Sequence, residues 1–133
     1  MSDISILLVD DEADFVETMS KRFRIRKIDV ASASNGPDAL NLLEEREFDV
    51  AILDVRMPGM DGLELLRRIR AKHPLTEVIM LTGHASLETG MQGMSLGAFD
   101  YVLKPADFDD LLDKVRRAAE RRALNVRTRH AGG

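Results

Sequence analysis

The stretch Val50-Ala51-Ile52-Leu53-Asp54 decides the fold, because four apolar residues run directly into a carboxylate. The segment that follows it, Met57-Pro58-Gly59-Met60-Asp61-Gly62, is rich in residues that end regular structure. A short apolar run closed by Pro and Gly predicts a strand that is buried on both faces and followed by a loop. Asp54 then lies at the tip of this strand, either as a turn residue that bonds its own backbone or as a group with a chemical role.

Two more unbroken apolar runs end in polar side chains. Residues 6–9 lead into Asp10-Asp11-Glu12, and residues 78–81 lead into Thr82-Gly83-His84. Both runs resemble residues 50–54 in length and apolar content, so we expect two further strands in the interior of a sheet.

Two weaker segments complete the expected set of strands. Residues 28–31 alternate between apolar and polar side chains, which is typical of a strand with less cover on one face. Residues 101–103 form a short run that ends in Lys104-Pro105. We therefore expect both segments at the edges of the sheet.

Apolar residues at helical spacing follow each expected strand. We expect five helices, whose starts are marked by turn residues at 10–12, 34–37, 62, 86 and 107. The third helix should stop by His73-Pro74, because the residue before proline avoids the helical region. The fifth should end near Leu124 with a frayed tail, and its last turns carry cations that complement the helix dipole, namely Arg116, Arg117, Arg121 and Arg122.

The expected fourth helix is rich in methionine and glycine. Leu87, Met91 and Met94 recur at helical spacing and are expected on its inner face. Gly90 and Gly93 lie inside this helix, and an interior glycine costs about 1 kcal/mol against alanine. We therefore expect a loose fourth helix that alanine at both glycine positions would stiffen.

Five strands that alternate with five helices predict a single α/β domain, a parallel sheet with helices on both faces. The three apolar strands must be interior, which selects the flavodoxin-like strand order 2-1-3-4-5. Right-handed crossovers then bring the tips of strands one, three and four together at the edge where open sheets bind ligands. We expect this domain over residues 4–123, with residues 124–133 as a tail or the start of a linker.

This topology gathers three carboxylates, those of Asp10, Asp11 and Asp54, in one cleft, with Thr82 and Lys104 beside them. Crowded carboxylates repel one another and need a cation, and oxygen ligands without cysteine favour Mg²⁺. The metal would leave Asp54 able to attack phosphorus. Thr82 supplies a hydrogen-bond donor and Lys104 a positive charge, both of which phosphoryl transfer requires.

Four motifs in these places resemble the response-regulator receiver domains of two-component signalling, the CheY-like family. They are Val9-Asp10-Asp11-Glu12, residues 53–62, Leu81-Thr82-Gly83 and residues 100–105. The resemblance implies that Asp54 accepts a phosphoryl group from a sensor histidine kinase or a phosphotransfer protein. It also implies a Mg²⁺ site with Asp11 and Asp54 as direct ligands, Asp10 acting through water, and the backbone carbonyl of Arg56 as the last protein ligand.

The same resemblance implies a switch rather than an enzyme with a separate substrate. Thr82 would move toward the phosphate and Tyr101 would turn inward, which would change the surface formed by the fourth helix, the last strand and the fifth helix. An output or a second copy of the chain could bind there. In relatives, the side chains at the positions of Arg56 and His84 tune how fast the phosphoryl group is lost.

Composition excludes several other classes of function. There is no cysteine, so disulfides and thiolate chemistry are excluded. The net charge of -4 argues against direct nucleic-acid binding by this domain. We find no apolar run long enough to span a membrane and no basic start of a signal peptide, so we expect a cytoplasmic protein.

Two alternatives from other classes stay open at this point. A Mg²⁺-dependent phosphatase of the haloacid dehalogenase group would carry a second acid two residues after its nucleophile, where this chain has Arg56, and would need a cap. A dinucleotide- or flavin-binding protein would need backbone amides after the first strand, where this chain has acids and no Gly-x-Gly-x-x-Gly.

Overall fold

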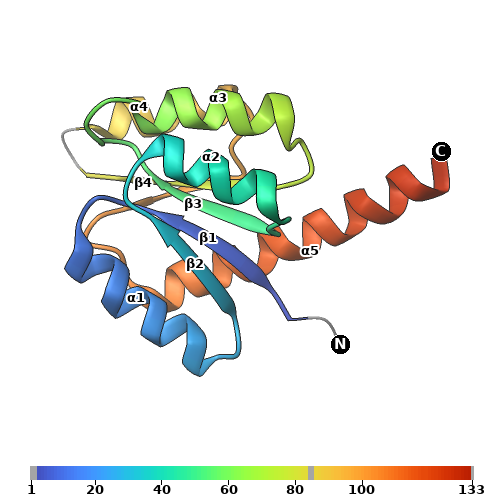
Figure 1. The fold of residues 1–133 in the computed structure, drawn as a ribbon, viewed down its shortest axis with the longest axis horizontal. Helices are drawn as coiled ribbons and strands as arrows, with labels where there is room; N and C mark the ends of the chain where they lie inside the picture. The colour runs from blue at the N-terminus through green and yellow to red at the C-terminus, as the bar shows by residue number, and fades with distance from the viewer. Residues whose placement is uncertain (1–2, 84–85, 133) are drawn as a thin grey trace.

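Strands and helices alternate along the chain (Figure 1), as the sequence predicts. The computed structural model describes residues 3–83 and 86–132. In chain order the elements are β1 (Ser5–Val9), α1 (Ala13–Ile25), β2 (Asp29–Ala33), α2 (Gly36–Glu45), β3 (Val50–Asp54), α3 (Gly62–Lys72), β4 (Glu77–Thr82), α4 (Leu87–Ser95), β5 (Asp100–Leu103) and α5 (Phe108–Gly132).

The strands form one parallel sheet in the order β2-β1-β3-β4-β5, which confirms the predicted topology. All residues of β3 and β4 are buried, and so are those of β1 after Ser5. The partly polar strands β2 and β5 lie at the two edges. The three unbroken apolar runs therefore form the interior strands, which are buried on both faces, as is typical of parallel sheets.

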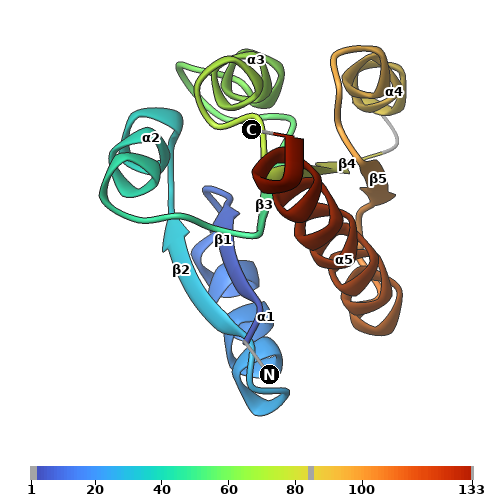
Figure 2. The ribbon, with the colours of Figure 1, turned by 90° about the vertical axis from the view of Figure 1, so that its right-hand side faces the viewer.

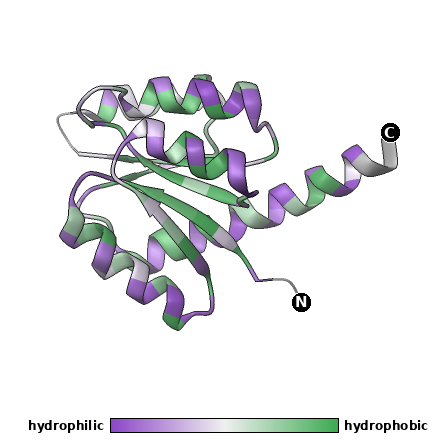
Figure 3. Cartoon of the chain, viewed as in Figure 1, coloured by the Kyte–Doolittle hydropathy of each residue, from purple (hydrophilic) through white to green (hydrophobic). Residues whose placement is uncertain are grey.

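Helices cover both faces of the sheet, with α1 and α5 on one face and α2, α3 and α4 on the other (Figures 1 and 2). Phe23 and Phe108 pack together under the first face, with ring centroids 5.0 Å apart. Leu65, Leu66 and Ile69 of α3 are fully buried under the second. Figure 3, coloured by the hydropathy of each residue, shows mostly apolar strands between helices that carry both polar and apolar residues. Full burial of one large apolar side chain, such as Leu65 or Phe23, contributes about 1.5–3 kcal/mol to the free energy of folding.

Several helix starts are capped by polar side chains, two of them, Asn35 and Asp107, in segments that the sequence marks as helix starts. The side chains of Asn35, Asp61 and Asp107 each accept a hydrogen bond from a backbone N–H three residues later, at 2.9–3.0 Å. The third helix ends with His73 as its C-cap, just before the proline, as expected.

The fifth helix is longer than we expected. It does not end near Leu124 but continues to Gly132, and its last part projects beyond the sheet (Figure 1). The expected four arginines therefore lie in the middle of α5, not in its last turns. Two of them form ion pairs with acids at the N-terminal ends of β3 and β4. Arg122 lies 3.1 Å from Asp49, and Arg121 lies 3.7 Å from Glu77. Residues 120–131 contain no glycine or proline that would stop a helix.

The fourth helix is rotated about its own axis by roughly 100°, or one residue, from the orientation that we expected, and Leu87 is half-buried. Met91 and Met94 are 53% and 41% exposed, whereas Gly90 and Gly93 are buried. A Cβ atom on Gly90 would lie 2.8 Å from Cγ2 of Thr82. The glycines therefore allow a close approach of helix and sheet, and alanine at Gly90 would have to displace Thr82 as well as favour the helix.

No helix in the described part of the chain is both long enough and apolar enough to cross a membrane.

Candidate functional site

Three carboxylates meet at the edge of the sheet where β1 and β3 end. One oxygen each of Asp10, Glu12 and Asp54 lies within 4.8 Å of the other two. The adjacent pairing of Val9 with Leu53 places the two strand ends side by side. Asp10 and Asp54 are buried, whereas Glu12 is exposed. The sheet order that the sequence predicts thus brings Asp10 and Asp54 together, as expected.

Sequence reasoning did not single out the side chain of Glu12. The backbone N–H of Glu12 donates a hydrogen bond to Oδ1 of Asp10 at 2.9 Å, which turns the chain at the end of β1. This turn brings the carboxylate of Glu12 into the group. The expected third member, Asp11, is exposed beside the site. The sequence offers only a run of three consecutive acids here. The geometry of the turn decides which of their carboxylates join Asp54.

The backbone after β3 holds Asp54 in place. The backbone N–H of Arg56 donates to Oδ1 of Asp54 at 3.2 Å, and the N–H of Gly62 donates to the carbonyl of Val55 at 3.0 Å. A Cβ atom on Gly62 would lie only 2.4 Å from the carbonyl oxygen of Asp54. Glycine is thus required for the start of α3 to pack against the end of the strand.

Lys104 reaches into the carboxylate group from the end of β5. Its Nζ lies 2.7 Å from Oδ2 of Asp10, 3.0 Å from Oε1 of Glu12 and 3.8 Å from Oδ2 of Asp54. Its backbone N–H donates to the carbonyl of Thr82 at 2.8 Å, which continues the pairing of β5 with β4. The predicted neighbourhood of Lys104 and the acids is therefore present.

The charges of the site shift two ionisation equilibria. Burial of the carboxyl group and the negative charge of Asp10 raise the pKa of Asp54 to about 6, against the opposing effect of Lys104. Burial disfavours the charged form of Lys104. The hydrogen bonds to Asp10 and Glu12, together with the negative charges of Asp10 and Asp54, outweigh this effect and raise the pKa of Lys104 above its usual value. A cation is thus favoured among these carboxylates.

Thr82 ends β4 and is fully buried. Its hydroxyl group donates to the backbone carbonyl of Ser86 at 2.7 Å and lies 3.2 Å from the hydroxyl oxygen of Ser86. The structure thus places Thr82 at the expected edge of the sheet, with its hydroxyl group bonded to the start of α4.

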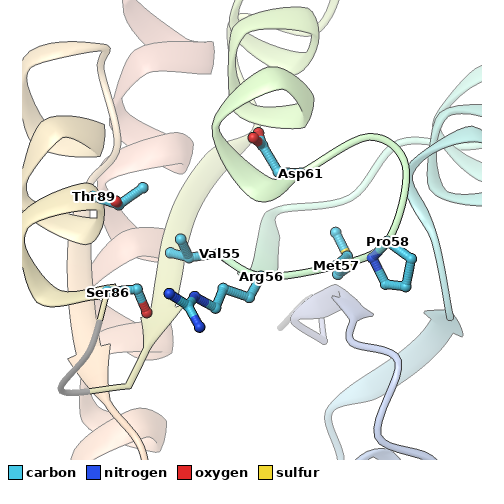
Figure 4. Close-up of a pocket in the computed structure, with 7 residues that line it drawn as sticks. All are labelled: Val55, Arg56, Met57, Pro58, Asp61, Ser86 and Thr89. Atoms are coloured by element: carbon cyan, nitrogen blue, oxygen red, sulfur yellow. The ribbon is translucent and has the colours of Figure 1, made fainter.

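A cavity of about 420 Å³ lies between the loop after β3 and the start of α4 (Figure 4). The side chain of Arg56 extends across it toward Ser86. The residues that line this cavity are Val55, Arg56, Met57, Pro58, Asp61, Ser86 and Thr89.

The sequence predicts roles for two further residues, Tyr101 and His84. Tyr101 is half-buried against the apolar core between the sheet and α2 and α3. His84, the other residue expected to affect the lifetime of a phosphoryl group, lies outside the described residues.

Comparison with known proteins decides the family. The sequence pattern of the response regulator receiver domain matches residues 6–116. The chain belongs to the response-regulator receiver family. It is thus the receiver domain of a two-component response regulator, a signalling module, which confirms the resemblance and the flavodoxin-like fold and sets aside the phosphatase and the flavin-binding protein.

Curated relatives of this receiver domain are much longer proteins. It is 38% identical over 125 residues to the regulatory protein AtoC of Escherichia coli K12, an alignment that covers 94% of this chain and 27% of AtoC. It is 39% identical over 118 residues to the response regulator protein PilR of Pseudomonas aeruginosa, covering 89% and 26%. The receiver domain thus spans about a quarter of the length of these relatives.

Solved structures agree with the fold. A receiver domain protein from Clostridium thermocellum superposes with a TM-score of 0.87 at 33% identity, covering 91% of this chain and 98% of that one. NtrX from Brucella abortus, solved in complex with ADP, superposes with a TM-score of 0.89 at 30% identity, covering 96% of this chain and 29% of NtrX.

Proposed function

We propose that this receiver domain accepts a phosphoryl group on Asp54 from the phosphohistidine of a sensor kinase or a phosphotransfer protein. The observation that supports this most is the position of Asp54: a buried carboxylate at a strand tip, grouped with Asp10 and Glu12 and 3.8 Å from the Nζ of Lys104. A nucleophile, acids for a metal and a positive charge are the parts that phosphoryl transfer to a carboxylate needs.

The donor set suits Mg²⁺. The grouped atoms are all carboxylate oxygens, two of them from buried residues, and Mg²⁺ prefers oxygen ligands while keeping several waters. In this proposal the ligands follow the family resemblance: Asp54 and Asp11, which lies outside that group, bind the ion directly, Asp10 acts through water, and the backbone carbonyl of Arg56 completes the protein ligands. When bound, the ion neutralises carboxylate charge and the charge that develops on the phosphoryl oxygens.

In the transfer step, a carboxylate oxygen of Asp54 attacks the phosphorus atom of the phosphohistidine. The new O–P bond forms as the P–N bond breaks, and the electron pair of that bond stays on the imidazole ring of the donor. Lys104 and Thr82 then bind phosphoryl oxygens, Lys104 through its ammonium group and Thr82 through its hydroxyl group. Hydrolysis of the same acyl phosphate by water resets the domain, and we propose that Arg56 and His84 affect its rate.

The phosphoryl group acts by stabilising one of two arrangements of the domain. Thr82 and Tyr101 change position in this proposal, and the surface of α4, β5 and α5 changes with them. That surface exposes Met91, Met94 and Leu103, which suits contact with an output domain or with a second copy of the chain.

The test is incubation with Mg²⁺ and acetyl phosphate, followed by intact mass measurement of the wild type and of Asp54→Asn. We expect the wild type to gain the mass of one phosphoryl group and Asp54→Asn to gain none. Asp109→Asn, the same change at an exposed position of α5, is the matched control and should behave as the wild type does. Equal labelling of Asp54→Asn would contradict the proposal.

A further inference from the structure

The hydroxyl group of Thr82 contacts both the backbone carbonyl and the hydroxyl group of Ser86 at the start of α4. The hydroxyl oxygen of Thr82 lies 2.7 Å from the backbone carbonyl of Ser86 and 3.2 Å from its hydroxyl oxygen. Both side chains are buried, with Thr82 0% and Ser86 6% exposed. The contact at 2.7 Å is the shortest, so the proton of the Thr82 hydroxyl group points to the carbonyl. The hydroxyl group of Ser86 contacts the Thr82 oxygen and also lies 3.5 Å from the carbonyl oxygen of Gly83.

This arrangement uses the only proton that Thr82 can donate. A threonine hydroxyl group carries one donor hydrogen. While the carbonyl of Ser86 accepts it, that hydrogen cannot be donated to a phosphoryl oxygen on Asp54. Binding of Thr82 to a phosphoryl group therefore requires that its bond to the first turn of α4 breaks.

Gly90 holds the helix against the same side chain. A Cβ atom at this position would lie 2.8 Å from Cγ2 and 3.2 Å from Oγ1 of Thr82. The backbone of α4 therefore packs directly on the threonine, with no side chain between them that could absorb a rotation of Thr82. A reoriented Thr82 must be accommodated by the first turns of α4.

We propose that Ser86 is a positioning residue that holds Thr82 bonded to α4 and so sets how far the resting domain favours its unphosphorylated arrangement. This inference rests on the proposed function, because it concerns the response of Thr82 to a phosphoryl group on Asp54. The hydroxyl group of Ser86 stabilises the bonded orientation of Thr82, and the phosphoryl group has to overcome that stabilisation. Removal of this hydroxyl group shifts the equilibrium toward the arrangement that binds a phosphoryl group.

The test compares wild type, Ser86→Ala and Ser86→Thr for binding of beryllofluoride, a phosphoryl analogue, in the presence of Mg²⁺ by calorimetry. Loss of one buried hydrogen bond predicts affinity for beryllofluoride about three- to tenfold higher in Ser86→Ala. Ser86→Thr keeps a hydroxyl group and should restore the wild-type affinity. Ser95→Ala is the matched control, because this serine lies at the other end of α4 and donates to the nearby carbonyl of Gln92 at 2.8 Å.

A double-mutant cycle separates action through Thr82 from a general effect on α4. Thr82→Val keeps the shape of the side chain and removes its hydroxyl group. In that background we expect Ser86→Ala to leave the affinity for beryllofluoride unchanged. In amide NMR spectra without the analogue, the α4 signals of Ser86→Ala should move along the line toward the positions of the bound wild type, whereas a merely structural change would displace them in other directions.

The outcomes distinguish the inference from the proposed function. Binding by the wild type with no gain in Ser86→Ala, or an equal gain in the Thr82→Val background, would overturn the role of Ser86 alone. Failure of the wild type to bind beryllofluoride with Mg²⁺ would overturn the proposed function and, with it, the inference.

Discussion

The Nζ atom of Lys104 lies 2.7 Å from Oδ2 of Asp10, although the two residues are 94 positions apart in the sequence. The ammonium group also lies 3.0 Å from Glu12 and 3.8 Å from Asp54, so it carries positive charge into the carboxylate group where a divalent cation would bind. A Mg²⁺ ion at this site would therefore be repelled by Lys104, while both would attract a phosphoryl group.

Lys104→Gln should bind Mg²⁺ more tightly and beryllofluoride less tightly than the wild type. Removal of one nearby positive charge is worth about 1 kcal/mol after screening by solvent, or roughly a fivefold gain in Mg²⁺ affinity. Both affinities can be measured by calorimetry, with the exposed Lys72→Gln as the control. Weaker binding of Mg²⁺ by Lys104→Gln would show that the lysine assembles the metal site instead of competing with the metal.

A comparison of Glu12→Gln with Asp11→Asn tests which acids bind the metal. The structure groups Glu12 with Asp10 and Asp54, whereas the family resemblance assigns direct ligation to Asp11. If Asp11 is a direct ligand and Glu12 contributes only charge, Asp11→Asn should lower the affinity for Mg²⁺ more than tenfold, and Glu12→Gln about two- to fivefold. The reverse ranking would make Glu12 the ligand.

Stability should depend on pH through Asp54 when chelator keeps divalent ions away. Because its pKa is raised from 3.8 to about 6, Asp54 favours folding when it is protonated, and this contribution is lost as the pH rises from about 4 through about 6. Relative to the wild type, Asp54→Asn should therefore become more stable over this range, by about 1–2 kcal/mol once solvent screening is allowed for.

Urea unfolding at pH 4 and pH 8 measures this difference, with Asp109→Asn as the control. Saturating Mg²⁺ should reduce the advantage of Asp54→Asn at pH 8, because the ion favours the charged carboxylate. A stability difference that is the same at both pH values would refute the raised pKa.

Alanine at the two buried glycines of α4 should have different effects. At Gly90 the new methyl group would lie 2.8 Å from Thr82. Such overpacking destabilises the fold by about 1–3 kcal/mol, whereas the higher helix propensity of alanine stabilises it by about 1 kcal/mol. Gly93→Ala would meet the flexible side chain of Met80 at 3.1 Å, which can give way. We expect Gly90→Ala to be less stable than the wild type and Gly93→Ala to be similar to it in urea unfolding. Greater stability of Gly90→Ala would show that α4 can shift at no cost.

The sequence was sufficient to predict the sheet and the gathering of Asp10, Asp54, Thr82 and Lys104. Three unbroken apolar runs had to be interior strands, because only those strands are covered on both faces. Side chains at the tips of parallel strands then share one edge, whatever their separation along the chain. Topology alone therefore predicts this part of the site.

Three features of the structure depend on contacts that the spacing of apolar residues in the sequence does not reveal. Glu12 reaches the site through the turn at Asp10, a local geometry that three consecutive acids leave open. Met91 and Met94 match an apolar stripe, but the glycines beside them permit a closer approach to the sheet and so decide which face turns inward. Helix α5 runs past Leu124, because arginines in its middle bind acids at the strand ends and no helix-stopping residue follows.

Identification of the phosphorylated side chain tests the central proposal most directly. After incubation with Mg²⁺ and acetyl phosphate, borohydride reduction converts an aspartyl phosphate to homoserine, whose position peptide mass spectrometry then locates. We predict homoserine at position 54 in the wild type and at none of the neighbouring acids, with the yield abolished by chelation of Mg²⁺. Homoserine at Asp10, Asp11 or Glu12, or none at any position despite bound Mg²⁺, would contradict the assignment of Asp54 as the phosphoacceptor.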